Sequence, residues 1–305
     1  MRFWRSRVGA IALVVLVACG VVLGATVVQV HRGTAPRHLE APAIDFEAMR
    51  IPVENVQFAA ADGVPLGGWL LPGAPDAPGV ILCHDAGSSR AALLNLAITL
   101  HGQGFTTLLF DFRGHGESGG TRSTLGLEEK RDVLGAVDLL VRRLGAETKR
   151  IGIYGVGMGA YSAVLAAADR PALRVLVLDG LYPDVEFRLV RQVYAGWSFA
   201  VDKLGFLPKT VFSAMRGGAS ADERAADVIG NLPGRDFLFL VPAGDTALAD
   251  AMQRMYESIP AQADADGNLV VLPATQGDGL YDDQLARYHE RVSGFFVTRL
   301  RKSTA

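Results

Sequence analysis

One stretch near the middle of the chain, IGIYGVGMGA at residues 151–160, limits the possible folds most strongly. A short run rich in β-branched residues ends at Gly155, and an alanine-rich run of helical character begins at Gly159. Glycines let a strand and a helix approach closely across a sharp turn, and they tolerate a left-handed backbone at its centre, here Gly157. The stretch therefore predicts a strand–turn–helix crossover of the kind that builds parallel sheets.

The same glycines suggest a phosphate-binding loop as a competing interpretation. However, G-x-G-x-G differs from the dinucleotide pattern G-x-G-x-x-G, and no Lys-Ser/Thr pair of a P-loop follows it. The net charge of −2 and the pI near 6.3 provide no basic field for nucleic acid. We therefore expect neither a nucleotide cofactor nor any other cofactor, and no nucleic-acid partner.

Strand and helix patterns alternate around this stretch. The sequence predicts strands at residues 53–60, 66–71, 80–83, 106–110, 151–154, 175–178, 237–241 and 269–272, and helices at 90–101, 127–144, 160–169, 248–259 and 284–302. The first two strands flank Asp62-Gly63, a strong hairpin pair. Residues 180–236 are less regular and rich in aromatic residues, typical either of a lid or of helices packed on the sheet. The predicted class is α/β, with a mostly parallel sheet covered by helices on both faces.

The N-terminus predicts a membrane helix. Residues 1–7 are basic, and residues 8–30 are apolar apart from Gln29. At about 1.5 Å per residue this run reaches about 34 Å, enough to cross a hydrocarbon core of about 30 Å. A cleaved signal peptide has a shorter apolar core and a small-residue exit. We expect an uncleaved anchor at residues 1–30, a linker at 31–50 and a folded domain at 51–305, with a possible lid at 180–236.

Arginines flanking the helix predict its orientation. Three of them precede it and two, Arg32 and Arg37, follow it, so the N-terminus should stay inside and the domain should lie outside the cytoplasm at the cell membrane. An alternative is a lipoprotein, because the residues before Cys19 resemble a lipidation box. Mostly apolar residues continue past Cys19, where a mature lipoprotein normally turns polar. Cys19 and Cys83 are the two cysteines, and no intrachain disulfide is expected.

Three stretches together resemble the α/β-hydrolase family, in particular its serine-aminopeptidase-like and lysophospholipase-like esterases. LCHDAGSS at residues 82–89 resembles the family's strand followed by H-G-x-G, with Asp85 in place of a glycine. LFDFRGHGESGG at 109–120 is similar to D-x-R-G-x-G-x-S-x-G and is the most specific signal. Residues 155–159 are similar to the nucleophile elbow G-x-S-x-G. The resemblance covers about residues 53–301 and implies an α/β-hydrolase fold.

The resemblance also implies a nucleophilic Ser, an acid and a His, in that chain order, with amide donors for an oxyanion. The nucleophile position holds Gly157. Asp245 matches the acid, although an N-cap of the following helix is the competing interpretation. The histidine position falls near Gly277 and Asp278, and neither is histidine. The implied oxyanion donors are the amide of Met158 and one near Ala86.

None of the six histidines is expected to act as the missing base. His84 lies in the presumed oxyanion loop, His115 in the R-G-H-G-E-S loop and His289 inside the last predicted helix. The remaining three lie in the linker or at a helix end. A base must lie within hydrogen-bond reach of the proton it removes, and these positions do not place one there.

These observations favour a membrane-anchored, catalytically inactive hydrolase-like protein that binds a small molecule or a protein. The predicted binding residues are His84, Asp85, Ala86, Gly157 and Met158. The alternative is an esterase, lipase or peptidase with a displaced nucleophile, for which the candidates are Cys83, Ser88, Ser89 and Ser118. Metal-assisted hydrolysis through Asp245, Asp278 and a histidine lacks any ligand spacing, and no metal site is expected.

Overall fold

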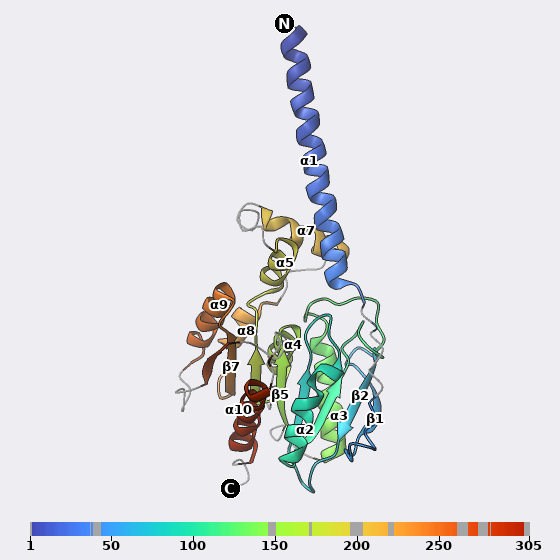
Figure 1. Ribbon diagram of the computed structural model, residues 1–305, viewed down its shortest axis with the longest axis vertical. Helices are drawn as coiled ribbons and strands as arrows, with labels where there is room; N and C mark the ends of the chain where they lie inside the picture. The colour runs from blue at the N-terminus through green and yellow to red at the C-terminus, as the bar shows by residue number, and fades with distance from the viewer. Residues whose placement is uncertain are drawn as a thin grey trace. The chain divides into compact units, whose positions relative to one another are not determined.

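A sheet of eight strands organises the larger part of the chain in the computed structural model (Figure 1). The structure describes residues 2–36, 38, 44–145, 151–170, 173–195, 204–218, 223–260, 268–273, 280 and 282–301. These residues divide into two units. One consists of Met1–Thr34 and Val185–Ala221, and the other, which holds the sheet, of Ala35–Asp184 and Asp222–Ala305.

The strands occur in the order β1-β2-β4-β3-β5-β6-β7-β8. Strand β2 runs antiparallel to both of its neighbours, and the other pairs are parallel. The strands are β1 (Glu54–Ala59), β2 (Pro65–Leu71), β3 (Gly79–Cys83), β4 (Thr106–Phe110), β5 (Ile151–Val156), β6 (Val175–Asp179), β7 (Asp236–Pro242) and β8 (Leu269–Leu272). The predicted α/β class is confirmed, and so is the hairpin, whose Gly63 has φ 88°.

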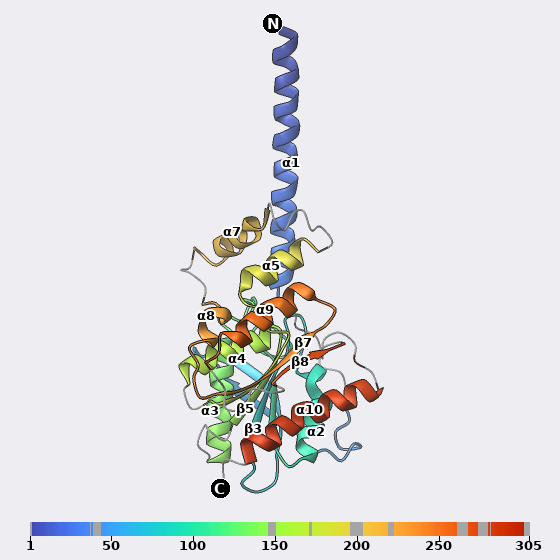
Figure 2. The same ribbon diagram turned by 90° about the vertical axis from the view of Figure 1, so that its left-hand side faces the viewer.

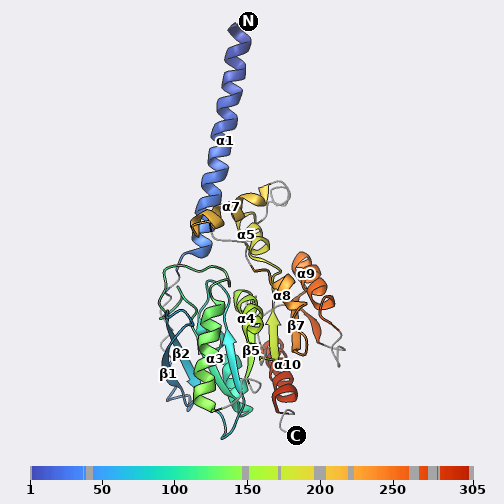
Figure 3. The ribbon, with the colours of Figure 1, turned by 180° about the vertical axis from the view of Figure 1, so that it is seen from behind.

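Helices cover both faces of this sheet. A 3-10 turn η1 (Arg90–Leu93) leads into α2 (Leu94–Gly102), which contacts the last helix, α10 (Asp282–Arg301). Helices α3 (Lys130–Leu144) and α4 (Met158–Asp169) lie on the opposite face, as Figure 2 shows with the sheet between them and α10, and Figure 3 from behind. Helix α8 (Ala225–Ile229) packs on α4, and α9 (Thr246–Glu257) packs on β7.

Two glycines three positions apart on β5 explain how closely the helices on both faces approach the sheet. A Cβ added to Gly152 would meet Phe296 of α10, whereas one added to Gly155 would meet the backbone of α4 at Gly159 and Ala160. Side chains alternate between the two faces along a strand, so residues three apart face opposite sides. Each glycine therefore allows one of the two helical layers to pack closely on β5. The core between β5 and α10 is apolar and includes Val292 and Phe296, both fully buried.

The described residues of the smaller unit contain three helices: α1 (Arg2–Thr34), α5 (Val185–Val193) and α7 (Phe206–Met215). Helices α5 and α7 contact each other and α1. Helix α1 therefore extends past the predicted end of the apolar run at residue 30, and the linker begins only after Thr34. Residues 180–236 supply α5 and α7 to this unit and α8 to the surface of α4, and the lid expected in this stretch stays a prediction.

Candidate functional site

The turn between β5 and α4 consists of Gly157 alone. Its φ is 50° and its ψ is −107°, a combination that favours glycine, as the sequence predicts for this position. The Gly157 amide donates to the carbonyl of Asp179 over 2.8 Å, which ties the turn to the end of β6. Strand β5 continues through Val156 and α4 begins at Met158. The turn is therefore shorter than the sequence predicts, where the strand ends at residue 154 and the helix begins at residue 160.

The carboxylate of Asp85 lies directly against this turn. The Met158 amide donates to Asp85 Oδ1 over 2.7 Å. A Cβ built on Gly157 would overlap the same carboxylate, with Asp85 Cγ only 2.6 Å away. Asp85 thus occupies the space that a side chain at position 157 would need, and it binds the first amide of α4. Its negative charge lies at the N-terminus of α4, where the helix dipole favours an anion.

Two neutral histidines hold the loop that carries Asp85. His84 Nδ1 donates to the Asp85 carbonyl over 2.8 Å, while its Nε2 accepts from the Phe112 amide over 3.1 Å. His115 is engaged in the same way, donating from Nδ1 to the Arg113 carbonyl and accepting at Nε2 from the Gly87 amide. Burial, and then the neighbouring His115, lowers the pKa of His84 to about 4. Both rings are therefore structural, and neither has a free nitrogen for general-base chemistry.

The most specific sequence motif, at residues 109–120, forms a buried polar scaffold beside this loop. Asp111 accepts from the Arg90 amide over 2.8 Å and from Arg90 Nη1 over 2.6 Å. The Ser118 hydroxyl donates to the Asp111 carbonyl and accepts from the Gly67 amide over 3.0 Å. A Cβ on Gly116 would overlap Asp111, and its φ is 45°. The motif thus fixes η1 and the His115 loop, and Ser118 is engaged within it.

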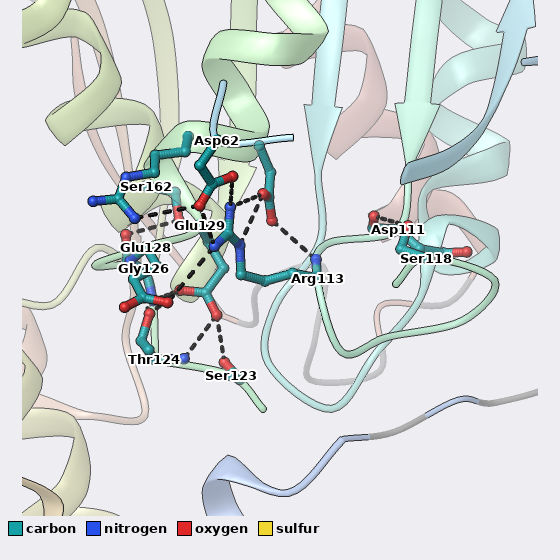
Figure 4. Close-up of polar contacts among 12 residues, drawn as sticks. Asp62, Asp111, Arg113, Ser118, Ser123, Thr124, Gly126, Glu128, Glu129 and Ser162 are labelled. Atoms are coloured by element: carbon teal, nitrogen blue, oxygen red, sulfur yellow. Dashed lines mark hydrogen bonds and ion pairs between the residues drawn. The ribbon is translucent and has the colours of Figure 1, made fainter. Parts of the chain in front are cut away.

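Arg113 continues this scaffold toward α3 (Figure 4). It contacts Asp132 on α3 through Nη2 at 2.6 Å and Nε at 2.9 Å, and Asp62 of the hairpin turn through both terminal nitrogens. Burial raises the pKa of Asp132 to about 7, and the hydrogen bonds from Arg113 oppose that rise. Hydrogen bonds to two carboxylates hold this buried arginine, and through it they position the loop.

Another buried carboxylate, Glu129, closes the loop that follows the motif (Figure 4). Its two oxygens accept from the Ser123 hydroxyl, the Thr124 amide, the Thr124 hydroxyl and the Gly126 amide, over 2.6 to 2.8 Å. The Glu129 side chain is fully buried. With four donors the carboxylate is fully used, which makes it a structural capping group.

The remaining predicted site residues are placed as follows. Asp245 follows β7 and is the N-cap of α9, where its side chain accepts from the Leu248 amide over 3.0 Å. Ala86 follows Asp85 and is partly exposed. Gly277 and Asp278 lie outside the described residues. The structure therefore brings His84, Asp85, Gly157 and Met158 together at the carboxyl ends of β3 and β5, while Asp245 occupies a cap after β7.

Sequence reasoning missed one buried cluster next to the turn. Asp179, the last residue of β6, lies 2.5 Å from the hydroxyl of Tyr288 on α10, and Tyr154 Oη lies 2.6 Å from that hydroxyl. Burial, with the Asp179 charge as the next cause, raises the pKa of both phenols well above their usual value. The sequence signal was an aspartate closing the apolar run VLVLD before Gly180. The cluster fixes the strand end to which Gly157 is hydrogen-bonded.

The displaced-nucleophile candidates occupy structural positions or an exposed loop. Cys83 ends β3 fully buried, and burial raises the pKa of its thiol, which disfavours the reactive thiolate. Ser88 and Ser89 are partly exposed, and Ser89 directly precedes η1. Among the described residues, no group of three histidine, cysteine or acidic side chains could hold a metal ion.

Comparisons with known proteins agree with this architecture. The sequence model of the serine aminopeptidase (S33) family matches residues 75–197. An uncharacterised Mycobacterium tuberculosis protein is 35% identical over 119 residues, which cover 38% of this chain and 42% of that protein. The uncharacterised protein YfhR of Escherichia coli is 28% identical over 157 residues, covering 49% and 54%. The matched part thus spans about half of these relatives or less.

The likeness to a solved structure extends over most of the chain. An esterase from Pyrococcus furiosus superposes with a TM-score of 0.63 at 23% identity, covering 87% of this chain and 97% of the esterase. At that identity the superposition establishes the fold. Together with the family match and the strand order, it shows that the chain has the α/β-hydrolase fold.

Proposed function

We propose that this α/β-hydrolase-fold protein is a membrane-anchored pseudo-hydrolase, which has lost hydrolytic chemistry and uses the region around Gly157 to bind a ligand. One observation carries the proposal: the Asp85 carboxylate lies where a nucleophile's side chain would stand, and it accepts a hydrogen bond from the Met158 amide. A negative charge at this point repels the oxyanion that acyl transfer would generate, and Asp85 already takes the Met158 amide and the space beside it.

The missing catalytic groups support the same conclusion. Gly157 carries no hydroxyl, and the rings of His84 and His115 use both nitrogens in hydrogen bonds to the backbone. No histidine occurs between His115 and His289 in the sequence, and His289 lies within α10. In a serine protease, losing nucleophile or base lowers kcat about a million-fold, equivalent to about 8 kcal/mol of barrier. Amide donors alone do not lower the activation barrier by about 8 kcal/mol.

Exposed apolar side chains on α1 support the membrane part of the proposal. An 18-residue stretch within Gly9–Thr34 has a mean hydropathy of 2.9, and Leu13 and Leu16 are 63% and 70% exposed. A row of such side chains is unstable in water and stable in lipid. Packing of α5 and α7 against α1 further favours an uncleaved helix, because cleavage of the whole segment as a signal peptide would remove their partner.

Covalent labelling tests the loss of chemistry. The full chain, solubilised in detergent, is treated with a broad fluorophosphonate probe and assayed with esters of short and long acyl chains, beside an active serine hydrolase. We expect no adduct by intact mass and no turnover. Stoichiometric labelling of one serine, with turnover abolished by its replacement with alanine, establishes the alternative enzyme with a displaced nucleophile.

Reconstruction of the site is a sharper form of the same test. Gly157→Ser alone should stay inactive, because it supplies a hydroxyl with no base and meets Asp85. Combining it with Asp85→Ala and Asp278→His, or with Gly277→His in place of the latter, supplies each missing group that the family resemblance indicates and should give weak ester turnover. An active single Gly157→Ser variant means that a base is already present and contradicts the proposal.

Fractionation tests the anchor independently. Membranes washed with high salt should retain the protein and detergent should release it, since salt screens charges without weakening the burial of a helix in lipid. Mass spectrometry should find the intact N-terminus. A mature chain that begins at a lipidated Cys19 establishes the lipoprotein alternative, and release by salt contradicts anchoring.

A further inference from the structure

Helix α1 has two distinct parts. Every described side chain from residue 9 to residue 21 is exposed. Beyond them a stripe along one face is covered: Thr26, Val30 and Thr34 are 1%, 0% and 4% exposed, at the four-residue spacing of a single helix face. Helices α5 and α7 contact α1 in the same unit, and a Cβ on Gly33 would overlap the Gln192 side chain of α5. The two short helices therefore cover the C-terminal part of α1.

The position of this stripe sets how far α5 and α7 lie from the bilayer that α1 would cross. Of the apolar run at 8–30, the part before the covered stripe is residues 8–25, which span about 27 Å, close to the hydrocarbon thickness of about 30 Å. Thr26 then falls at the outer boundary, and Thr34 lies about 12 Å beyond it. Headgroup layers add about 5 to 8 Å on each side of the hydrocarbon. Helices packed on Thr26 to Thr34 thus lie at the depth of the outer headgroups.

The composition of residues 185–221, here called the surface segment, matches that depth. The segment carries five basic and two acidic residues, a formal charge of +3 in a chain whose net charge is −2. It also contains Trp197 and Phe199, and Phe206 at the start of α7 is 60% exposed. Basic and aromatic residues together are typical of segments that lie at the interface of an anionic bilayer.

We propose that helices α5 and α7 of the surface segment bind the headgroup layer of an anionic phospholipid bilayer, the membrane in which α1 is anchored, with Phe206 inserted at its boundary. This inference rests on the proposed anchoring, since the depth follows from α1 crossing the bilayer. The covered stripe and the excess of basic residues indicate a second contact with the same membrane. An anchor alone does not require this contact, which is made by helices that lie far from α1 in the sequence.

Site-directed fluorescence tests this contact in the full chain reconstituted into liposomes. In a Cys19→Ser background with the buried Cys83 retained, Phe206→Cys is labelled with bimane. Val271→Cys on β8 is the matched control, because Val271 and Phe206 are 59% and 60% exposed. Phospholipid carrying a doxyl group near the headgroup should quench the label at position 206 about threefold more than the label at 271, given insertion to about 5 to 10 Å.

The lipid charge is tested with the same labels. Quenching at 206 should be stronger in liposomes containing phosphatidylglycerol than in pure phosphatidylcholine, and Arg188→Glu with Arg191→Glu should remove that difference. Arg142→Glu with Arg287→Glu, on the other unit, should leave it intact. Equal quenching at 206 and 271 in protein that floats with liposomes overturns the proposal while anchoring stands. Protein that does not float with them shows that the anchor is wrong. Quenching at 206 that is indifferent to lipid charge overturns the assignment to anionic lipid.

Discussion

The contact between Asp85 and Gly157 makes a quantitative prediction, because each residue restricts what the other can be. A side chain at Gly157 enters a positive-φ position, which costs about 1 kcal/mol. It also displaces the Asp85 carboxylate from the Met158 amide, and a hydrogen bond to a charged group contributes about 1.5 to 3 kcal/mol. We therefore expect Gly157→Ser to lower the free energy of unfolding by about 2.5 to 4 kcal/mol.

The informative quantity is the coupling between the two positions. Asp85→Ala should cost about 1.5 to 3 kcal/mol in the parent, since it removes the same hydrogen bond, yet almost nothing after Gly157→Ser has already broken it. Asp85 is not among the residues with positive φ, so alanine fits its backbone. The double variant should thus be about as stable as Gly157→Ser alone. Gly157→Ala, which adds the Cβ without the hydroxyl, should behave like Gly157→Ser.

Denaturant unfolding of the four proteins in mild detergent, followed by tryptophan fluorescence, measures this cycle. The two-state free energies need identical denaturant slopes for the comparison to hold. Destabilisations that add to within about 0.5 kcal/mol would mean that Asp85 and Gly157 do not share the space, and the reasoning about the blocked site would be refuted.

Three further outcomes follow from the buried groups. Burial lowers the pKa of His84 from 6.5 to about 4. Between these two pH values the unfolded chain binds a proton at His84 and the folded chain does not. Stability should then be lost toward pH 4 at up to about 1.4 kcal/mol per pH unit, and a Tm–pH profile of His84→Asn should be flatter. Glu129→Gln should cost about 2 to 4 kcal/mol in a melting assay, because the amide nitrogen would face a donor. Cys83 should react with maleimide only after unfolding, in a Cys19→Ser background, and reaction at the native rate would contradict its burial.

Much of the sheet could be predicted from the sequence because its strands are short apolar runs between turn residues. Strands β4 and β8 have the predicted bounds. Strand β5 differs, since Gly155 was expected to end it. In the structure, Gly155 pairs with Cys83 on β3 and Leu178 on β6, and pairing on both sides outweighs the weak strand preference of glycine.

The packing partner of α5 and α7 could not be predicted from the sequence. Their amphipathic pattern indicates helices with one covered face, but such a pattern does not specify what covers it. The partner is α1, a helix more than a hundred residues earlier whose apolar residues look uniform in sequence. What distinguishes the covered stripe is the pair Thr26 and Thr34, whose hydroxyls bond to carbonyls four residues earlier at 2.9 Å and which lie on one face.

For the site, the sequence indicated the altered positions but not their contact. Gly157 and Asp85 are two positions that the sequence analysis predicts to depart from the family pattern. Their interaction depends on β3 and β5 being neighbours in the sheet, which brings together residues 73 positions apart. The Asp179 cluster is harder still, because Tyr288 comes from α10, 109 positions later.

The part of the family pattern that this chain keeps is the part that holds the fold together. In the stretch at 109–120, Asp111, Arg113 and Ser118 each complete hydrogen bonds among buried groups, so replacing any of them leaves a buried partner unsatisfied. No side chain at position 157 is needed to complete such hydrogen bonds, and glycine there avoids the strain that its positive φ would impose on another residue. Once Gly157 has opened the space, an aspartate at position 85 gains the Met158 amide and the positive end of α4. Stability alone therefore favours keeping the scaffold and placing Asp85 against the turn, and a likeness to serine aminopeptidases over residues 75–197 is compatible with the pseudo-hydrolase that we propose.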